Sequence, residues 1–175
     1  PLVQKSVGMP NGLLTAAGVS PPGLVRVTTN QRETGNQMAI TREDYLETLE
    51  WLSDELEAEL AEAARIAVDL EDADFVYVLN PGEVKYAPMS LLAAARIFHV
   101  AGARWTMPSS GWDGTNYGLF SGDDDLGAHV GRLAYDQAVR IRARKIVVSE
   151  CGHGFRALRW EVPNWSAADP PVPVE

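Results

Sequence analysis

A thiol and an imidazole lie two residues apart in the segment E-C-G-H-G of residues 150–154. If the backbone stays extended between them, the side chains of Cys151 and His153 point the same way. They could then form a thiolate–imidazolium pair or act as two ligands of one metal ion. A metal site needs further ligands, which would have to come from Asp113, His129, Glu150 or a segment outside this sequence, and the spacing does not choose among them.

The residues around this pair predict where it lies in a fold. The β-branched run Ile146–Val148 predicts a short strand buried in a parallel sheet, and Phe155–Trp160 predicts a short helix or helical turn. Ligands of open α/β sheets bind at the carboxyl ends of strands, where amides at the start of a following helix favour a thiolate. Cys151 is therefore predicted at the end of a central strand, facing a cleft.

The segment from Pro108 to Gly122 is expected to form the other side of that cleft. It is rich in glycine and aromatic residues and too long for a simple connector, which favours a binding or docking role. Three of its residues are candidate substrate-binding residues, together with Arg156 in the helix that follows the thiol. These three are Asp113, Asn116 and Tyr117.

An amphipathic helix is predicted from Arg42 to about Ala67. Thr41 is a good N-cap, and apolar residues recur at steps of three and four as far as Leu60. The helix carries many carboxylates on one face. We expect a solvated face rather than a metal site, because no histidine accompanies them at helical spacing.

A βαβ unit follows this helix. The apolar run Phe75–Leu79 predicts a strand closed by a turn at residues 80–82, Pro88 can open a helix, and Ala103–Met107 predicts a second strand. Such a unit requires parallel strands joined by a right-handed crossover. Asp123–Asp125 are expected to cap the next helix, which leads to the strand before Cys151.

The expected fold is therefore α/β, with three layers and a small, mainly parallel sheet of three to five strands. Residues 1–36 are punctuated by glycine and proline and predict an arm with one short helix, Gly12–Ala17. Residues 37–168 would form the α/β domain, and the proline-rich residues 169–175 a linker to a further part of the polypeptide.

Composition excludes several classes of function. The chain has 175 residues, 46% of them hydrophobic, with a net charge of -9, which argues against a nucleic-acid or anionic-membrane surface. Its single cysteine rules out an internal disulfide and fits a reducing cytoplasm, where we expect the protein to act. No apolar run reaches the length of a membrane span, and no phosphate-loop, dinucleotide or serine-hydrolase motif is present.

The motifs N-P-G-E-V-K-Y-A-P, A-G-A-R-W-T, G-W-D-G-T-N-Y-G-L-F-S-G-D and E-C-G-H-G-F-R-A-L-R-W resemble, in this order, a known family. It is the cysteine-rich (CCG) domain found in the D-type subunit of heterodisulfide reductase and in the related K-type subunit of the sulfite-reduction membrane complex. The likeness covers about residues 30–165. It implies an iron–sulfur oxidoreductase subunit acting in electron transfer, with a ferredoxin-like domain and a second CCG domain as partners, and possible contacts with other redox subunits.

The chain departs from the family pattern at most cysteine positions. The family's other cysteines would fall near residues 80–83 and 111–114, where this chain has none, and only Cys151 remains. The resemblance thus implies a degenerate repeat that cannot hold the noncubane iron–sulfur cluster alone. At most Cys151 lends one metal ligand to a cluster of the full-length protein. The alternative is a non-catalytic scaffold that docks domains or subunits, with Cys151 and His153 buried and hydrogen-bonded and with the acidic helix and the Trp112 loop as the contact surface.

Overall fold

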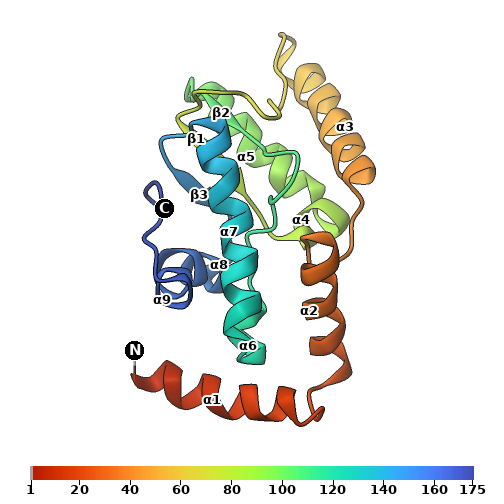
Figure 1. Ribbon diagram of the computed structural model, residues 1–175. Helices are drawn as coiled ribbons and strands as arrows, with labels where there is room; N and C mark the ends of the chain where they lie inside the picture. Colours follow the sequence, from red (N-terminus) through yellow and green to blue (C-terminus); the bar gives the residue numbers. More distant parts are fainter. Residues whose placement is uncertain (1) are drawn as a thin grey trace.

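The computed structural model describes residues 2–175 of the chain and the side chains of residues 9–175. Its sheet has three parallel strands, β1 (Phe75–Val78), β2 (Trp105–Thr106) and β3 (Ile146–Val148), in the order β2-β1-β3 (Figure 1). The strand that leads to Cys151 is therefore β3 at one edge of the sheet. The expectation of a central strand there is wrong, because β1 takes the middle position.

Side chains of β1 alternate between two hydrophobic clusters. Phe75 and Tyr77, with Leu79 just after the strand, pack in the cluster that also holds residues of α3 (Arg42–Leu60) and α5 (Pro88–Val100). Val76 and Val78 point the other way, into a cluster with residues of β3 and α7 (Asp124–Ile141). Because successive residues of a strand face opposite sides, both faces of the sheet are covered by helices. The predicted α/β fold with a small parallel sheet is confirmed.

Helix α3 is shorter than the prediction. Its N-cap is Thr41, as expected, since the Thr41 side chain accepts a hydrogen bond from the backbone N–H of Asp44. The helix ends at Leu60, where Ala61 adopts a left-handed conformation with φ 54°, and the predicted extension to Ala67 is wrong. The chain then turns back along α3, and Arg65 forms ion pairs with three exposed carboxylates of the helix, Glu50, Asp54 and Glu57.

Residues 2–36 form two helices instead of the predicted arm with one short helix. Helix α1 spans Leu2–Ala16 and α2 spans Pro22–Thr34. Thr15 and Asn11 donate hydrogen bonds to backbone carbonyls of α6 (Gly118–Ser121), which ties α1 to the loop before α7 (Figure 1). The predicted helix Gly12–Ala17 is thus only the end of α1.

The turn after β1 differs from the sequence prediction, whereas the start of α7 agrees with it. The turn predicted after β1 is the start of helix α4 (Pro81–Tyr86), whose N-cap is Asn80. Asp123 caps α7 by accepting a hydrogen bond from the N–H of Leu126, which confirms the capping role of the aspartate triplet.

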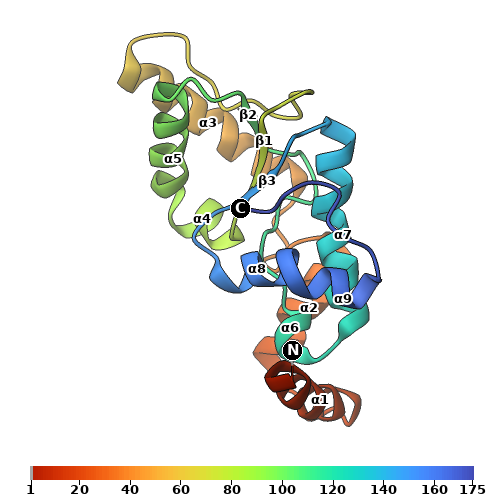
Figure 2. The ribbon, with the colours of Figure 1, turned by 90° about the vertical axis from the view of Figure 1, so that its left-hand side faces the viewer.

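The chain after Cys151 is helical over a longer stretch than predicted. Helix α8 (Gly152–Arg156), the π-helical turn η1 (Ala157–Glu161) and helix α9 (Val162–Ser166) follow one another directly. The chain then returns to the sheet, where Val174 pairs in parallel with Ile146 on the outer edge of β3 (Figure 2). Residues 173–175, predicted as part of a linker, are in this structure hydrogen-bonded to β3. Within the described residues, no helix combines the length and the apolar character required to span a lipid bilayer.

Candidate functional site

Cys151 is the N-cap residue of α8 and lies three residues after the last residue of β3, near the strand end where the sequence predicts it. Its Sγ lies 3.2 Å from Nδ1 of His153. The His153 ring in turn meets the rings of Tyr117 and Phe120 edge-on, with centroid distances of 5.8 and 5.0 Å. The structure therefore brings together Cys151, His153 and one of the predicted loop residues, Tyr117, at the carboxyl edge of the sheet.

The surroundings of the pair favour its neutral form. Burial raises the pKa of the Cys151 thiol, and an N–H donor from Gly154 offsets this only in part. The pKa of this thiol is raised further by the nearby carboxylates of Glu150, Asp113 and Glu83. Burial also lowers the pKa of His153. At neutral pH the pair is therefore a thiol and a neutral imidazole, and the thiolate–imidazolium pair of the sequence prediction is not favoured here.

The helix that carries Cys151 packs directly on the loop before α7. A Cβ atom built on Gly154 would lie 1.9 Å from the carbonyl oxygen of Gly114 and 3.3 Å from Sγ of Cys151. Only glycine permits such an approach of two backbones. On this side the sulfur faces packed backbone instead of the predicted cleft, and only 4% of the Cys151 surface is exposed.

Asp113 is buried and serves the loop itself. One carboxylate oxygen accepts hydrogen bonds from Gln31 Nε2 (3.0 Å) and the N–H of Gln37 (2.8 Å), and the other accepts from the N–H of Thr115 (2.7 Å). Burial raises the pKa of Asp113 to about 6, although these donors oppose the shift. With both oxygens occupied by the protein's own donors, the structure does not present Asp113 to a substrate.

Asn116 is likewise buried and bound internally. Its amide donates to the carbonyl of Gly127 in α7 at 2.9 Å, and its oxygen accepts from the N–H of Gly118 at 3.2 Å. Trp112, in the same loop, is buried and stacks on Tyr45 of α3 with the ring centroids 4.3 Å apart. Most of the loop predicted to bind or dock is therefore part of the core, and the Trp112 part of the predicted contact surface is wrong.

A polar network that sequence reasoning missed joins the ends of β1 and β3. Glu83 accepts hydrogen bonds from the backbone N–H of Asn80 and from the hydroxyl of Ser149. Asn80 in turn accepts from Gln37 and lies 3.4 Å from Glu150. The sequence signal was present, because Asn80 and Glu83 have the spacing of a capping box.

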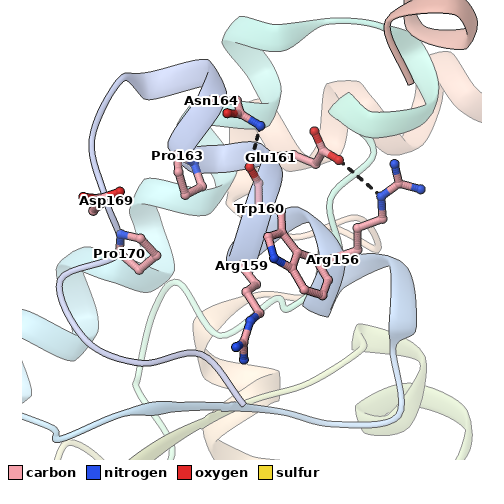
Figure 3. Close-up of a pocket in the computed structure, with 8 residues that line it drawn as sticks. All are labelled: Arg156, Arg159, Trp160, Glu161, Pro163, Asn164, Asp169 and Pro170. Carbon is pink, nitrogen blue, oxygen red and sulfur yellow. Dashed lines mark hydrogen bonds and ion pairs between the residues drawn. The ribbon is translucent and has the colours of Figure 1, made fainter. Parts of the chain in front are cut away.

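Arg156 is separated from the other predicted substrate-binding residues. It forms an ion pair with Glu161 at 3.2 Å and lines a hollow of about 500 Å³ between α8, α9 and residues 169–170 (Figure 3). The predicted substrate-binding set is therefore split among the buried Asp113 and Asn116, the half-buried Tyr117 beside His153, and Arg156 in the hollow.

No family model, curated protein or solved structure matches this chain. Among the described residues, no group of three or more histidine, cysteine or acidic side chains is placed to hold a metal ion. An iron–sulfur centre needs several such ligands, and this part of the chain offers one thiol. What the arrangement supplies by itself is a protonated thiol hydrogen-bonded to an imidazole beside an acidic network.

Proposed function

We propose that this chain is a domain of an iron–sulfur oxidoreductase subunit of the heterodisulfide reductase type, acting in the cytoplasm, and that it docks neighbouring domains instead of holding a cluster. The family assignment rests on the sequence motifs given above. A parallel sheet whose last strand is followed three residues later by a cysteine is compatible with this assignment.

The burial of the Cys151 thiol is the observation that favours a docking role over a redox role. A redox thiol reacts as an exposed thiolate. In this structure, only 4% of the Cys151 surface is exposed, the pKa of its thiol is raised, and its sulfur is hydrogen-bonded to His153. The internal hydrogen bonds of Asp113 and Asn116 also argue against substrate binding, because every side-chain oxygen of these two residues already accepts a hydrogen bond from the protein.

The exposed acidic face of α3 is the surface we assign to this docking. Arg65 neutralises part of the face, but Glu47 and Glu55 are exposed and have no ion-pair partner among the described side chains. Such a face suits a basic surface on a neighbouring domain, since charge complementarity steers association and fixes orientation.

Reversing the charge of this face tests the proposal. In the full-length subunit, the double variant Glu47→Lys/Glu55→Lys is expected to weaken co-purification of the partner redox subunits at least about tenfold and to remove its salt sensitivity. Cys151→Ser is the matched control and is expected to leave co-purification unchanged. Unchanged assembly in the charge-reversed variant, with its fold intact by circular dichroism, would count against the docking face.

A second candidate is a direct redox role for Cys151, passing electrons to a thiol, a disulfide or a partner redox centre. The observation in its favour is that His153, which covers the sulfur, is only partly buried and lies beside Phe120, which is 42% exposed. A modest movement of His153 would uncover the thiol. This role requires that Cys151 change the redox properties of the assembly.

Thiol labelling separates the two candidates. In the folded chain at pH 7.5, Cys151 is expected to react with a maleimide at least about tenfold more slowly than in the unfolded chain, because it is buried and protonated. His153→Ala should accelerate labelling by uncovering the sulfur. Rapid labelling of the wild type, together with altered absorbance and electron spin resonance spectra of the iron-loaded full-length Cys151→Ala variant, would establish the redox role instead.

A further inference from the structure

The hollow beside α8 and α9 has the size and lining of a small-molecule site. Its volume of about 500 Å³ falls within the range of ligand pockets. Two prolines, Pro163 and Pro170, form rigid apolar walls, and Trp160 lies between the charged side chains (Figure 3). Trp160 meets the ring of Phe155 edge-on, with a centroid distance of 5.4 Å, and still leaves 52% of its surface exposed.

Part of the backbone that lines the hollow forms a π-helical turn instead of an α-helix. Arg159, Trp160 and Glu161 are consecutive and all line it, and they lie in the π-helical turn η1. In an α-helix successive side chains point about 100° apart, so the wider π turn brings consecutive side chains closer to one side. Single π turns within helices occur frequently at functional sites.

The charges in the hollow indicate what it could bind. Arg156 and Glu161 neutralise each other. Arg159 donates one hydrogen bond to the carbonyl of Val174, and its guanidinium lies 5.5 Å from the centre of the Trp160 ring. Neither Arg159 nor Asp169 forms an ion pair with any side chain of residues 9–175. One cation and one anion without an ion-pair partner thus line the same hollow as the exposed indole.

We propose that this hollow binds a small zwitterion with a flat apolar ring, such as an aromatic amino acid. Its carboxylate meets Arg159, its ammonium meets Asp169 and its ring packs on Trp160. The ion pairs fix the orientation, and the indole and the proline walls supply apolar contact. The site contains neither Cys151 nor His153, so ligand binding there does not depend on the iron–sulfur assignment.

Titration of the chain with three related ligands tests this site. The readout is the indole N–H resonance of Trp160, assigned with the variant Trp160→Phe. L-phenylalanine is expected to shift it saturably. Phenethylamine, which lacks the carboxylate, and 3-phenylpropanoate, which lacks the ammonium, should each bind about two- to fivefold more weakly, as the loss of one partly exposed ion pair predicts.

Two variants assign the charges. Arg159→Gln should abolish the preference for L-phenylalanine over phenethylamine and keep the preference over 3-phenylpropanoate, and Asp169→Asn should do the reverse. Arg96→Gln is the control, because Arg96 is exposed on α5 across the sheet. The proposal is overturned if no saturable shift occurs up to the solubility of L-phenylalanine, if all three ligands bind equally, or if Asp169→Asn, an exposed substitution that leaves the fold intact, changes no preference.

Discussion

Replacing Gly154 with alanine is expected to lower the free energy of unfolding by about 3 kcal/mol, because the added Cβ overpacks a backbone contact. The new atom would lie 1.9 Å from the carbonyl oxygen of Gly114, and backbone cannot move aside as a flexible side chain can. Relief requires that α8 shift away from the loop that covers Cys151. Chemical denaturation followed by circular dichroism measures the loss, and faster labelling of Cys151 would report the shift.

Gly152, two residues earlier in the same helix, provides the matched control. A Cβ at Gly152 meets nothing within 4 Å, and its φ is not in the left-handed region. Gly152→Ala is therefore expected to be neutral or stabilising by up to about 1 kcal/mol, through the higher helix propensity of alanine. Equal stabilities of the Gly154→Ala and Gly152→Ala variants would show that α8 and the loop are not in close contact.

Several elements of the fold are readable from local sequence. The apolar run at residues 75–79 gives β1, and the prolines at positions 22, 81 and 88 each occupy the first turn of a helix. From the sequence, only Pro88 is predicted as a helix start, whereas Pro22 and Pro81 are predicted as breakers. Proline suits the first helical turn as well as it suits a turn between elements. Whether such a proline starts a helix or interrupts the chain depends on whether the residues after it become helical, and the local sequence does not determine this.

Other features depend on tertiary contacts that no local pattern encodes. The order β2-β1-β3 places Cys151 at a sheet edge, and strand order is set by the side on which each crossover packs. Ala61 ends α3 in a left-handed conformation that alanine rarely adopts, so the helix pattern gave no stop signal. At the site, Cys151 and His153 are in contact as predicted, although the backbone between them is helical from Gly152 and not extended. The sequence could not show that Gln31, 82 residues away, occupies the carboxylate of Asp113.

The burial of Asp113 is expected to make stability depend on pH. Its pKa rises from an ordinary 3.8 to about 6 in the folded chain, so the folded state binds the proton more tightly than the unfolded state. The free energy of unfolding should therefore fall as pH rises from about 4 through 6, by roughly 3 kcal/mol from this residue alone. Asp113→Asn removes this dependence, because the amide does not titrate.

At low pH the Asp113→Asn variant is expected to be less stable than the wild type by about 1–3 kcal/mol. Each Asp113 oxygen accepts a backbone N–H, from Gln37 and from Thr115, so either orientation of an asparagine amide presents its NH₂ group to a backbone donor. A protonated carboxyl can still accept at both oxygens. The difference in the free energy of unfolding between variant and wild type should thus shrink as pH rises from 4 to 7.5. Urea denaturation at each pH measures this difference. Asp136→Asn, an exposed substitution on α7, is the control for the loss of a surface carboxylate. A difference for Asp113→Asn that does not change with pH would mean that the Asp113 carboxylate is not buried as the structure has it.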